Sequence, residues 1–312
     1  MSYENKNVHI REKKFNSVEE MLDHISPWGE SPELNGFVFR GQSQENYELV
    51  PSALRLSDSE SFFRKAGHRK PDDGSGEYEY LQVAMEYQLL RAFYRLADQR
   101  GLAVPISNRV RANLSQEIEV DGIAGLNQPD YWLPTDLYET AALAQHYGIP
   151  TRLIDWTYDI YIALYFAFRG SIGRSGNMVV WAINKEYLSM IKNTVSRVNV
   201  EFITPHYSGN PNLSAQKGLF TLWPLLRPSK AEEFQSSYKQ GYVTVDRSSL
   251  DKLVLSSPME VGVQVFKKFV LPCSEAIRGC GILDKLGYDT SRVFPGYGGV
   301  AEQLLTRYRC NS

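Results

Sequence analysis

The sequence is poor in cysteine and carries little net charge. Three cysteines occur among 312 residues, Cys273, Cys280 and Cys310, and so few exclude a disulfide framework and a multi-cysteine zinc site. Lysine and arginine number 34 against 36 aspartates and glutamates, which gives a formal net charge of −2. This balance argues against a globally basic nucleic-acid binder, although a local basic patch would not show in the total.

Long apolar segments are also missing. The longest apolar run, residues 160–168, is too short to cross a bilayer. The first residues, MSYENKNVHIREKKF, contain no apolar core of a signal peptide. We therefore expect a cytoplasmic protein that makes no membrane contact.

What the sequence does contain is typical of a folded globular protein. Hydrophobic residues make up 43% and charged residues 22% of the chain, and a chain of this length can bury a large core without disulfides or metals. The 19 tyrosines, 14 phenylalanines and 5 tryptophans are the one compositional excess. Most of them should be core residues, and a few could line a pocket for a flat ligand.

Helical and strand patterns alternate along the chain. Apolar residues recur at helical spacing from Glu77 to Arg100, and Pro134, Gly148 and Pro150 bracket another helix that ends at His146. Further helices are expected at 17–26, 160–168 and 274–286, and strands at 36–39, 178–183, 219–223, 242–245 and 261–265. A polar turn is expected at 151–159.

These elements predict one α+β domain over residues 1–312, with a central mostly antiparallel or mixed β-sheet flanked by helices. Residues 1–35 are expected to form a helical lead-in. Residues 56–76, rich in Ser, Asp and Gly, are expected to form a mobile loop.

The densest group of polar residues is the segment Gln145-His-Tyr-Gly-Ile-Pro-Thr-Arg-Leu-Ile-Asp-Trp-Thr157. Polar side chains gathered between two apolar elements make a good binding site, because the flanking elements fix the backbone. Arg152 offers a fork of donors suited to phosphate or carboxylate. Thr157 or Asp159 can cap the helix that follows.

A structural role explains the same segment equally well. A buried ion pair between Arg152 and Asp155, with capping threonines, would hold two helices together without any ligand. His146 would then interact only with the C-terminal end of its own helix.

Several segments resemble the FRG-domain family, which is named for its Phe/Tyr-Arg-Gly motif. The matching segments are Phe39-Arg-Gly-Gln42, Leu49–Arg55, Gln145–Thr157, Ala163–Ala167, Ala215–Thr221 and Phe294-Pro295. They span residues 36–295. The resemblance implies a bacterial, phage or mobile-element protein that acts in phage defence or as a toxin.

The same motifs are distantly similar to those of ADP-ribosyltransferases, in which an arginine ends an early strand. The resemblance implies that NAD is a possible substrate and that Arg40 contacts its pyrophosphate. The usual Glu-x-Glu motif of these enzymes is missing; Asp155, Gln216 or Glu302 would have to replace it.

The resulting hypothesis assigns catalytic roles to Arg40, Asp155 and Gln216. It assigns ligand binding to Gln42, His146, Thr151, Arg152, Trp156, Thr157 and Phe220. No metal site is expected, and no certain cofactor. Trp156 or Phe220 would stack on nicotinamide, and Gln216 or Asp155 would hold ribose hydroxyls.

A rival hypothesis is a non-catalytic recognition domain that senses a nucleotide, a phage component or a protein partner. It uses Arg40 and Arg152 in the same way but needs no catalytic acid. A nuclease is disfavoured, because the sequence has no paired carboxylates or histidine cluster at metal-binding spacing. The near-neutral charge favours a small nucleotide-like molecule or a protein over broad nucleic-acid binding.

Overall fold

The computed structural model describes residues 9–29, 34–72, 76–108, 111, 130–192, 200–223, 225–227, 246–257 and 263–307. The described chain divides into two compact units. Unit 1 comprises the described residues of Met1–Glu48, Asp155–Leu219 and Asp251–Ser312, and unit 2 those of Leu49–Ile154 and Phe220–Leu250.

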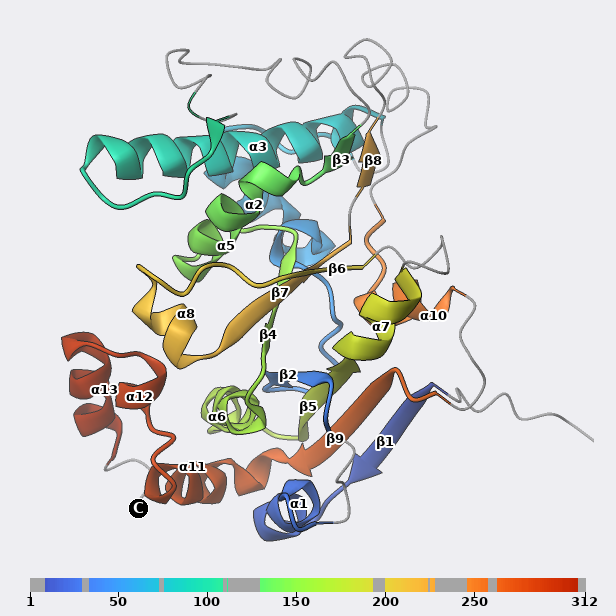
Figure 1. The fold of residues 1–312 in the computed structure, drawn as a ribbon, viewed down its shortest axis with the longest axis vertical. Helices are drawn as coiled ribbons and strands as arrows, with labels where there is room; N and C mark the ends of the chain where they lie inside the picture. The colour runs from blue at the N-terminus through green and yellow to red at the C-terminus, as the bar shows by residue number, and fades with distance from the viewer. Residues whose placement is uncertain are drawn as a thin grey trace, which may run out of the picture. The chain divides into compact units, whose positions relative to one another are not determined.

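The main sheet has the strand order β1-β9-β5-β2-β4-β7-β6 within the described residues (Figure 1). β1 runs parallel to β9, whereas β9–β5, β5–β2 and β2–β4 are antiparallel. The strands are β1 Ile10–Lys14, β2 Phe37–Gln42, β4 Leu153–Thr157, β5 Asn177–Asn184, β6 Glu201–Ile203, β7 Gly218–Leu222 and β9 Phe266–Pro272. The predicted α+β class with a mixed sheet is confirmed.

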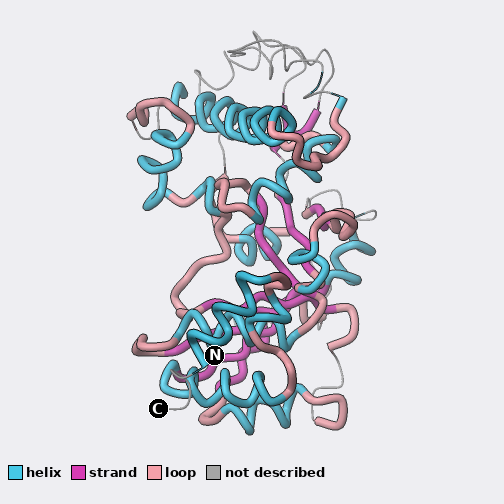
Figure 2. Tube along the Cα trace, turned by 90° about the vertical axis from the view of Figure 1, so that its left-hand side faces the viewer, coloured by secondary structure: helices cyan, strands magenta, loops and turns pink. Residues whose placement is uncertain are grey.

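Helices accompany these strands in unit 1, and Figure 2 shows them lying against the strands. Asp159 caps α6 through a hydrogen bond that its Oδ1 accepts from Tyr161 N, and Ser17 caps α1 in the same way by accepting from Glu20 N. The helices are α1 Val18–Ile25, α6 Ile160–Ser171, α7 Lys185–Lys192, α8 Pro211–Ala215, α10 Leu250–Leu255, η4 Cys273–Glu275, α11 Ala276–Lys285, α12 Thr290–Val293 and α13 Tyr297–Arg307.

Unit 2 is mainly helical. Its elements are η1 Ser52–Leu54, η2 Leu56–Asp58, α2 Ser59–Lys65, α3 Gly76–Gln99, η3 Thr135–Leu137 and α5 Tyr138–His146, with β3 Asp130–Trp132 antiparallel to β8 Leu225–Arg227. The long helix and the helix that ends at His146 were both predicted, and Gly101 and Gly148 end them with φ of +72° and +84°.

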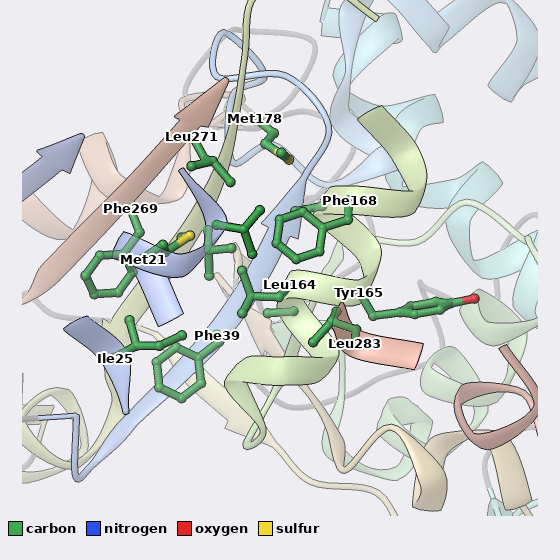
Figure 3. Close-up of a cluster of buried hydrophobic side chains, with 14 of the residues drawn as sticks. Met21, Ile25, Phe39, Leu164, Tyr165, Phe168, Met178, Phe269, Leu271 and Leu283 are labelled. Atoms are coloured by element: carbon green, nitrogen blue, oxygen red, sulfur yellow. The ribbon is translucent and has the colours of Figure 1, made fainter. Parts of the chain in front are cut away.

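The core of unit 1 lies between the sheet and helices α1, α6 and α11. Figure 3 shows side chains from all of these elements meeting in one buried cluster, which includes Met21, Ile25, Phe39, Leu164, Phe168, Met178, Phe269, Leu271 and Leu283. Burial of this apolar surface is the main term that stabilises the unit.

Gly41 allows helix α6 to lie directly on strand β2. A Cβ atom at Gly41 would be 1.9 Å from the carbonyl oxygen of Ala163 and 2.8 Å from the backbone nitrogen of Ala167. Both contacts are with backbone, which cannot move aside as a flexible side chain can. The glycine of the Phe39-Arg40-Gly41 motif is therefore required for packing.

Two local secondary-structure predictions are wrong. The expected loop at 56–76 contains α2, whose Phe62 and Phe63 are fully buried, and the expected turn at 151–159 contains strand β4. The expected helical lead-in contains the predicted helix, α1, and in addition strand β1. Short segments such as α2 and β4 carry weak periodicity, so burial decided these two elements, whereas the polar strand β1 forms through its pairing with β9.

Two other expected strands differ or cannot be compared. The strand expected at 261–265 is shifted, because β9 begins at Phe266 and the described residues 263–265 lie outside it. The strand expected at 242–245 lies outside the described residues. The single-domain boundaries at 1 and 312 stay a prediction.

In the described parts of the chain, helices fall short of the length and hydrophobicity that crossing a membrane requires.

We expect Gly41→Ala to lower the free energy of unfolding by about 1–3 kcal/mol or more, because the added methyl overlaps the α6 backbone. Gly281, within α11, is the matched control, since a Cβ there meets nothing within 4 Å. Gly281→Ala should raise stability by about 0.5–1 kcal/mol. Urea denaturation of both variants measures this, and equal stabilities would contradict the packing role of Gly41.

Candidate functional site

The residues predicted for the site fall in both units. Unit 1 holds Arg40, Gln42, Asp155, Trp156, Thr157 and Gln216. Unit 2 holds His146, Thr151, Arg152 and Phe220. Most of their polar side chains are engaged in contacts within the protein, and the pair Arg40–Asp155 is the more accessible.

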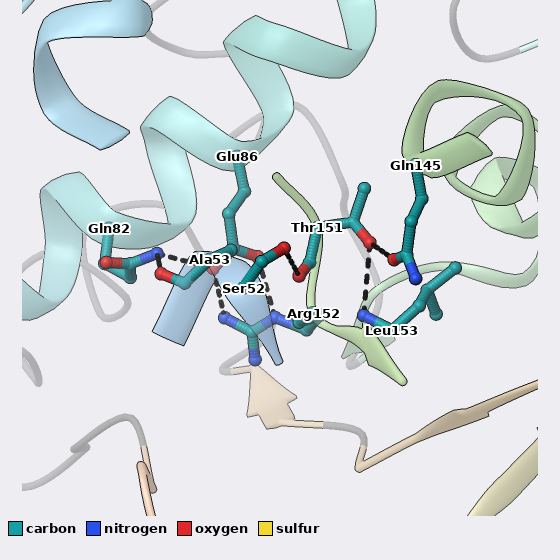
Figure 4. A network of polar contacts seen from close by, with 8 residues as sticks. All are labelled: Ser52, Ala53, Gln82, Glu86, Gln145, Thr151, Arg152 and Leu153. Carbon is teal, nitrogen blue, oxygen red and sulfur yellow. Dashed lines mark hydrogen bonds and ion pairs between the residues drawn. The ribbon is translucent and has the colours of Figure 1, made fainter. Parts of the chain in front are cut away.

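In unit 2, Arg152 belongs to a buried ion pair (Figure 4). Its Nε and Nη2 donate to the two carboxylate oxygens of Glu86 on α3 at 2.7 and 2.8 Å, and the side chains are only 4% and 3% exposed. Gln82, one turn earlier on α3, donates to the same carboxylate and to the carbonyl of Ala53. Arg152 therefore binds the protein itself.

Thr151 completes this network (Figure 4). Its carbonyl accepts from Ala53 N and from the hydroxyl of Ser52, and its own hydroxyl donates to Gln145 and accepts from Leu153 N. Two of the segments that carry the FRG resemblance, 49–55 and 145–157, are thereby joined to each other and to helix α3. The network fixes the backbone that enters β4.

These contacts correct the structural alternative drawn from the sequence. Arg152 pairs with Glu86, and Asp155 faces Arg40 instead. Glu86 lies far away in sequence within a long helix, so local spacing gave no signal for it. His146 is half-buried and packs edge-on against the ring of Tyr147, and Phe220 is buried.

In unit 1, Arg40 and Asp155 form a solvent-accessible ion pair between neighbouring strands. Arg40 Nη1 donates to Asp155 Oδ2 at 3.1 Å and to the Asp155 carbonyl oxygen at 2.9 Å. The Arg40 side chain is 19% exposed and that of Asp155 58% exposed. Arg40 lies inside strand β2, which continues to Gln42 and so extends three residues beyond the strand predicted at 36–39.

The other predicted residues of β2 and β4 are engaged in packing. The Gln42 side-chain oxygen accepts from Trp181 Nε1 at 3.1 Å, and both side chains are buried. Trp156 is 3% exposed. A ligand could stack on Trp156 only after displacing the residues that cover it, so the aromatic wall expected there is not open.

Thr157 and Gln216, both predicted for the site, lie next to each other. Their hydrogen bonds are made to other groups of the protein and hold its segments together. The Thr157 hydroxyl donates to the Gln216 carbonyl at 2.7 Å, and the Gln216 amide donates to the Val293 carbonyl at 3.2 Å. Gln216 thus links β4 to the segment before Phe294. Its side chain has no acidic group, and one of its two amide hydrogens is already used.

A group that sequence reasoning passed over surrounds Asp159. Its Oδ2 accepts from Lys217 Nζ at 2.9 Å and from the Tyr288 hydroxyl at 3.2 Å. Lys217 has φ of +46°, a backbone conformation uncommon outside glycine. Burial, and then the charge of Asp159, raise the pKa of Tyr288. Lys217 follows Gln216 directly and lies in segment 215–221, which carries part of the FRG resemblance. That segment was the one signal in the sequence that could have pointed to this group.

The described residues contain no group of three or more His, Cys, Asp or Glu side chains that could hold a metal ion. Glu302, the speculative substitute for the missing carboxylate, lies on α13 with Oε1 3.8 Å from Arg169 Nη2. Among the described residues, the accessible charged side chains of the motif segments include Arg40, Asp155, Lys217 and Arg55. They suit binding of an anion better than metal chemistry.

Residues 35–175 match the family model of the FRG domain. No curated protein and no solved structure matches the chain. The predicted FRG resemblance is confirmed over this segment, and the more distant likeness to ADP-ribosyltransferases stays a prediction.

We expect Arg152→Met to lower the free energy of unfolding by about 3–5 kcal/mol, because it removes the guanidinium that faces the buried Glu86 carboxylate. The double variant Arg152→Met/Glu86→Leu should recover much of this loss, since two apolar side chains need no charge partner. Urea denaturation of both variants provides the measurement. A loss below about 1 kcal/mol in the single variant would contradict the structural role.

Proposed function

We propose that the FRG domain at residues 35–175 binds a nucleotide-like, phosphate-bearing ligand through Arg40. The observation that carries this proposal is the contrast between the two motif arginines. Arg152 is buried against Glu86, whereas Arg40 faces a largely exposed carboxylate. Arg40 is the one of the two that a ligand can reach.

The energies of the two ion pairs support the same choice. An exposed pair such as Arg40–Asp155 contributes about 0–1 kcal/mol, so a phosphate that binds the guanidinium can replace the carboxylate at little cost. Charge-assisted hydrogen bonds from arginine to phosphate are stronger and can be bidentate. Breaking the buried pair of Arg152 would cost several kcal/mol.

A sharper form of the proposal is ADP-ribosyltransferase-like or NAD-cleaving chemistry. Asp155 is the observation that favours it, because its carboxylate lies 3.1 Å from the same guanidinium. Once displaced by the pyrophosphate, it could hold ribose hydroxyls and stabilise the cationic character that develops as nicotinamide leaves. Gln216 suits this role less well, since its side chain carries no negative charge and one of its amide hydrogens is bonded to the Val293 carbonyl.

The alternative is a non-catalytic recognition or sensor domain for a nucleotide, a phage component or a protein. It needs Arg40 and no acid.

We propose that the protein acts as a bacterial effector or in defence, in the cytoplasm. Growth arrest on expression that Arg40→Ala relieves would support an effector, and harmless expression would support a sensor.

Arg40→Ala should weaken binding of ADP-ribose at least tenfold in calorimetry, because a charge-assisted hydrogen bond contributes about 1.5–3 kcal/mol. Arg40→Lys should weaken binding less, since the charge is kept and the fork is lost. Arg278→Ala is the matched control, because Arg278 also forms an exposed ion pair in unit 1, with Glu19. Absent binding, or equal loss in Arg40→Ala and Arg278→Ala, would refute the proposal.

Asp155→Asn separates binding from catalysis. It should leave ADP-ribose affinity equal or higher, because the competing carboxylate is gone, and should lower nicotinamide release from NAD at least 100-fold. A wild-type protein that binds ADP-ribose but releases no nicotinamide would exclude the catalytic form and leave the recognition domain.

A further inference from the structure

Tyrosines and cations gather at one end of the sheet in unit 1. Register places Phe37 opposite Asn184 and Phe39 opposite Thr157, so β2 begins where β5 and β4 end. Lys185 directly follows β5, Tyr158 directly follows β4, and Lys217 directly precedes β7. Tyr158 N donates to the Lys217 carbonyl at 3.1 Å. We call the group formed by Lys185, Tyr158, Lys217, Tyr288 and Arg292 the strand-end surface.

Two cation–tyrosine pairs form the ends of this surface. Lys185 Nζ lies 5.2 Å from the ring centre of Tyr158, and the guanidinium carbon of Arg292 lies 3.9 Å from that of Tyr288. Tyr158 is 40% exposed and Arg292 is also exposed. The exposed members of the two pairs are therefore the Tyr158 ring and the planar Arg292 guanidinium, which lies over the partly buried Tyr288 ring.

Lys217 is linked by hydrogen bonds to both cation–tyrosine pairs. It is joined to Tyr158 through the backbone and to Tyr288 through the shared carboxylate of Asp159. Its side chain is 54% exposed, whereas that of Asp159 is only 7% exposed. The ammonium group thus remains open to solvent on the side away from Asp159.

The tyrosine hydroxyls are held in place. The Tyr158 hydroxyl is 3.2 Å from Thr204 Oγ1, and the neighbouring Tyr207 donates to the Gly218 carbonyl at 3.1 Å. The Tyr288 ring also packs against that of Tyr161 at 5.2 Å. The rings are therefore fixed before any ligand arrives, which lowers the entropy cost of stacking on them.

Three carboxylates, those of Asp159, Asp289 and Glu186, lie near the three cations, so a phosphate would contact individual cations and not a net positive field. Asp159 is balanced by Lys217, and the Asp289 carboxylate accepts hydrogen bonds from Ser291 and from Arg292 N at the start of α12. Glu186 is exposed beside Lys185. The net charge of −2 for the whole chain does not reveal this local arrangement.

We propose that the strand-end surface binds a short stretch of single-stranded nucleic acid. Aromatic rings that alternate with cations are the elements with which proteins bind single strands, the rings stacking on bases and the cations contacting phosphates. In this proposal the Tyr158 ring and the Arg292 guanidinium each stack on a base, and Lys217 contacts a phosphate. Three cations are too few for the phosphate contacts that hold duplex DNA. This surface does not include Arg40.

The test is fluorescence anisotropy with a labelled oligouridylate of about ten nucleotides, a length that covers typical single-strand sites. Tyr158→Ala and Arg292→Ala should each weaken binding by about fivefold or more, because base stacking contributes about 1–3 kcal/mol. Tyr47→Ala is the matched control: Tyr47 is 45% exposed and hydrogen-bonded to Arg174, and lies past the opposite end of β2. It should leave affinity unchanged, and Glu186→Gln should raise it.

Salt dependence provides a second measurement. Three phosphate contacts on a single strand predict a slope of log K against log salt concentration of about −2, and Lys217→Gln should reduce it by about 0.7. Absent binding, equal effects of Tyr158→Ala and Tyr47→Ala, equal binding of a duplex, or equally strong binding of uridine monophosphate would each overturn the proposal. Arg40→Ala should leave oligouridylate affinity unchanged, so this proposal can fail while ADP-ribose binding stands, or the reverse.

Discussion

The close contact between helix α6 and strand β2 is the constraint on which unit 1 depends. It exists because Gly41 has no side chain and because Ala163 and Ala167 are small. With the helix this close, its apolar residues reach the core that α1, α11 and the sheet share. A single methyl group at Gly41 would push apart two elements that hold the unit together.

The Phe39-Arg40-Gly41 triplet combines packing and chemistry in three consecutive residues. Phe39 is buried in the core, Gly41 lies against the helix, and Arg40 reaches Asp155 on the neighbouring strand. Successive residues of a strand point to opposite faces, so such a triplet can serve a core on one face and a polar group on the other. This explains why one short motif contributes both to stability and to the candidate site.

The long polar segment 145–157 likewise has two roles. Thr151 and Arg152 join η1, α3 and α5 through buried hydrogen bonds, while Asp155 is exposed and Thr157 bonds to Gln216. From sequence, Arg152 and Asp155 appeared equally suited to a ligand. Burial separated them, because a charge that is enclosed with its partner is costly to expose, whereas an exposed pair is not.

The sequence by itself determined the fold class, the long helices and their ends, and the FRG segment, because helical periodicity and terminal glycines are local signals. Tertiary structure decided the partners. Glu86 lies 66 positions from Arg152, Ala163 lies 122 positions from Gly41, and Tyr288 lies 129 positions from Asp159. It also decided which short apolar segments became strands. Side-chain contacts over such separations depend on how the chain packs, and no local pattern encodes which distant residue will face a given charge.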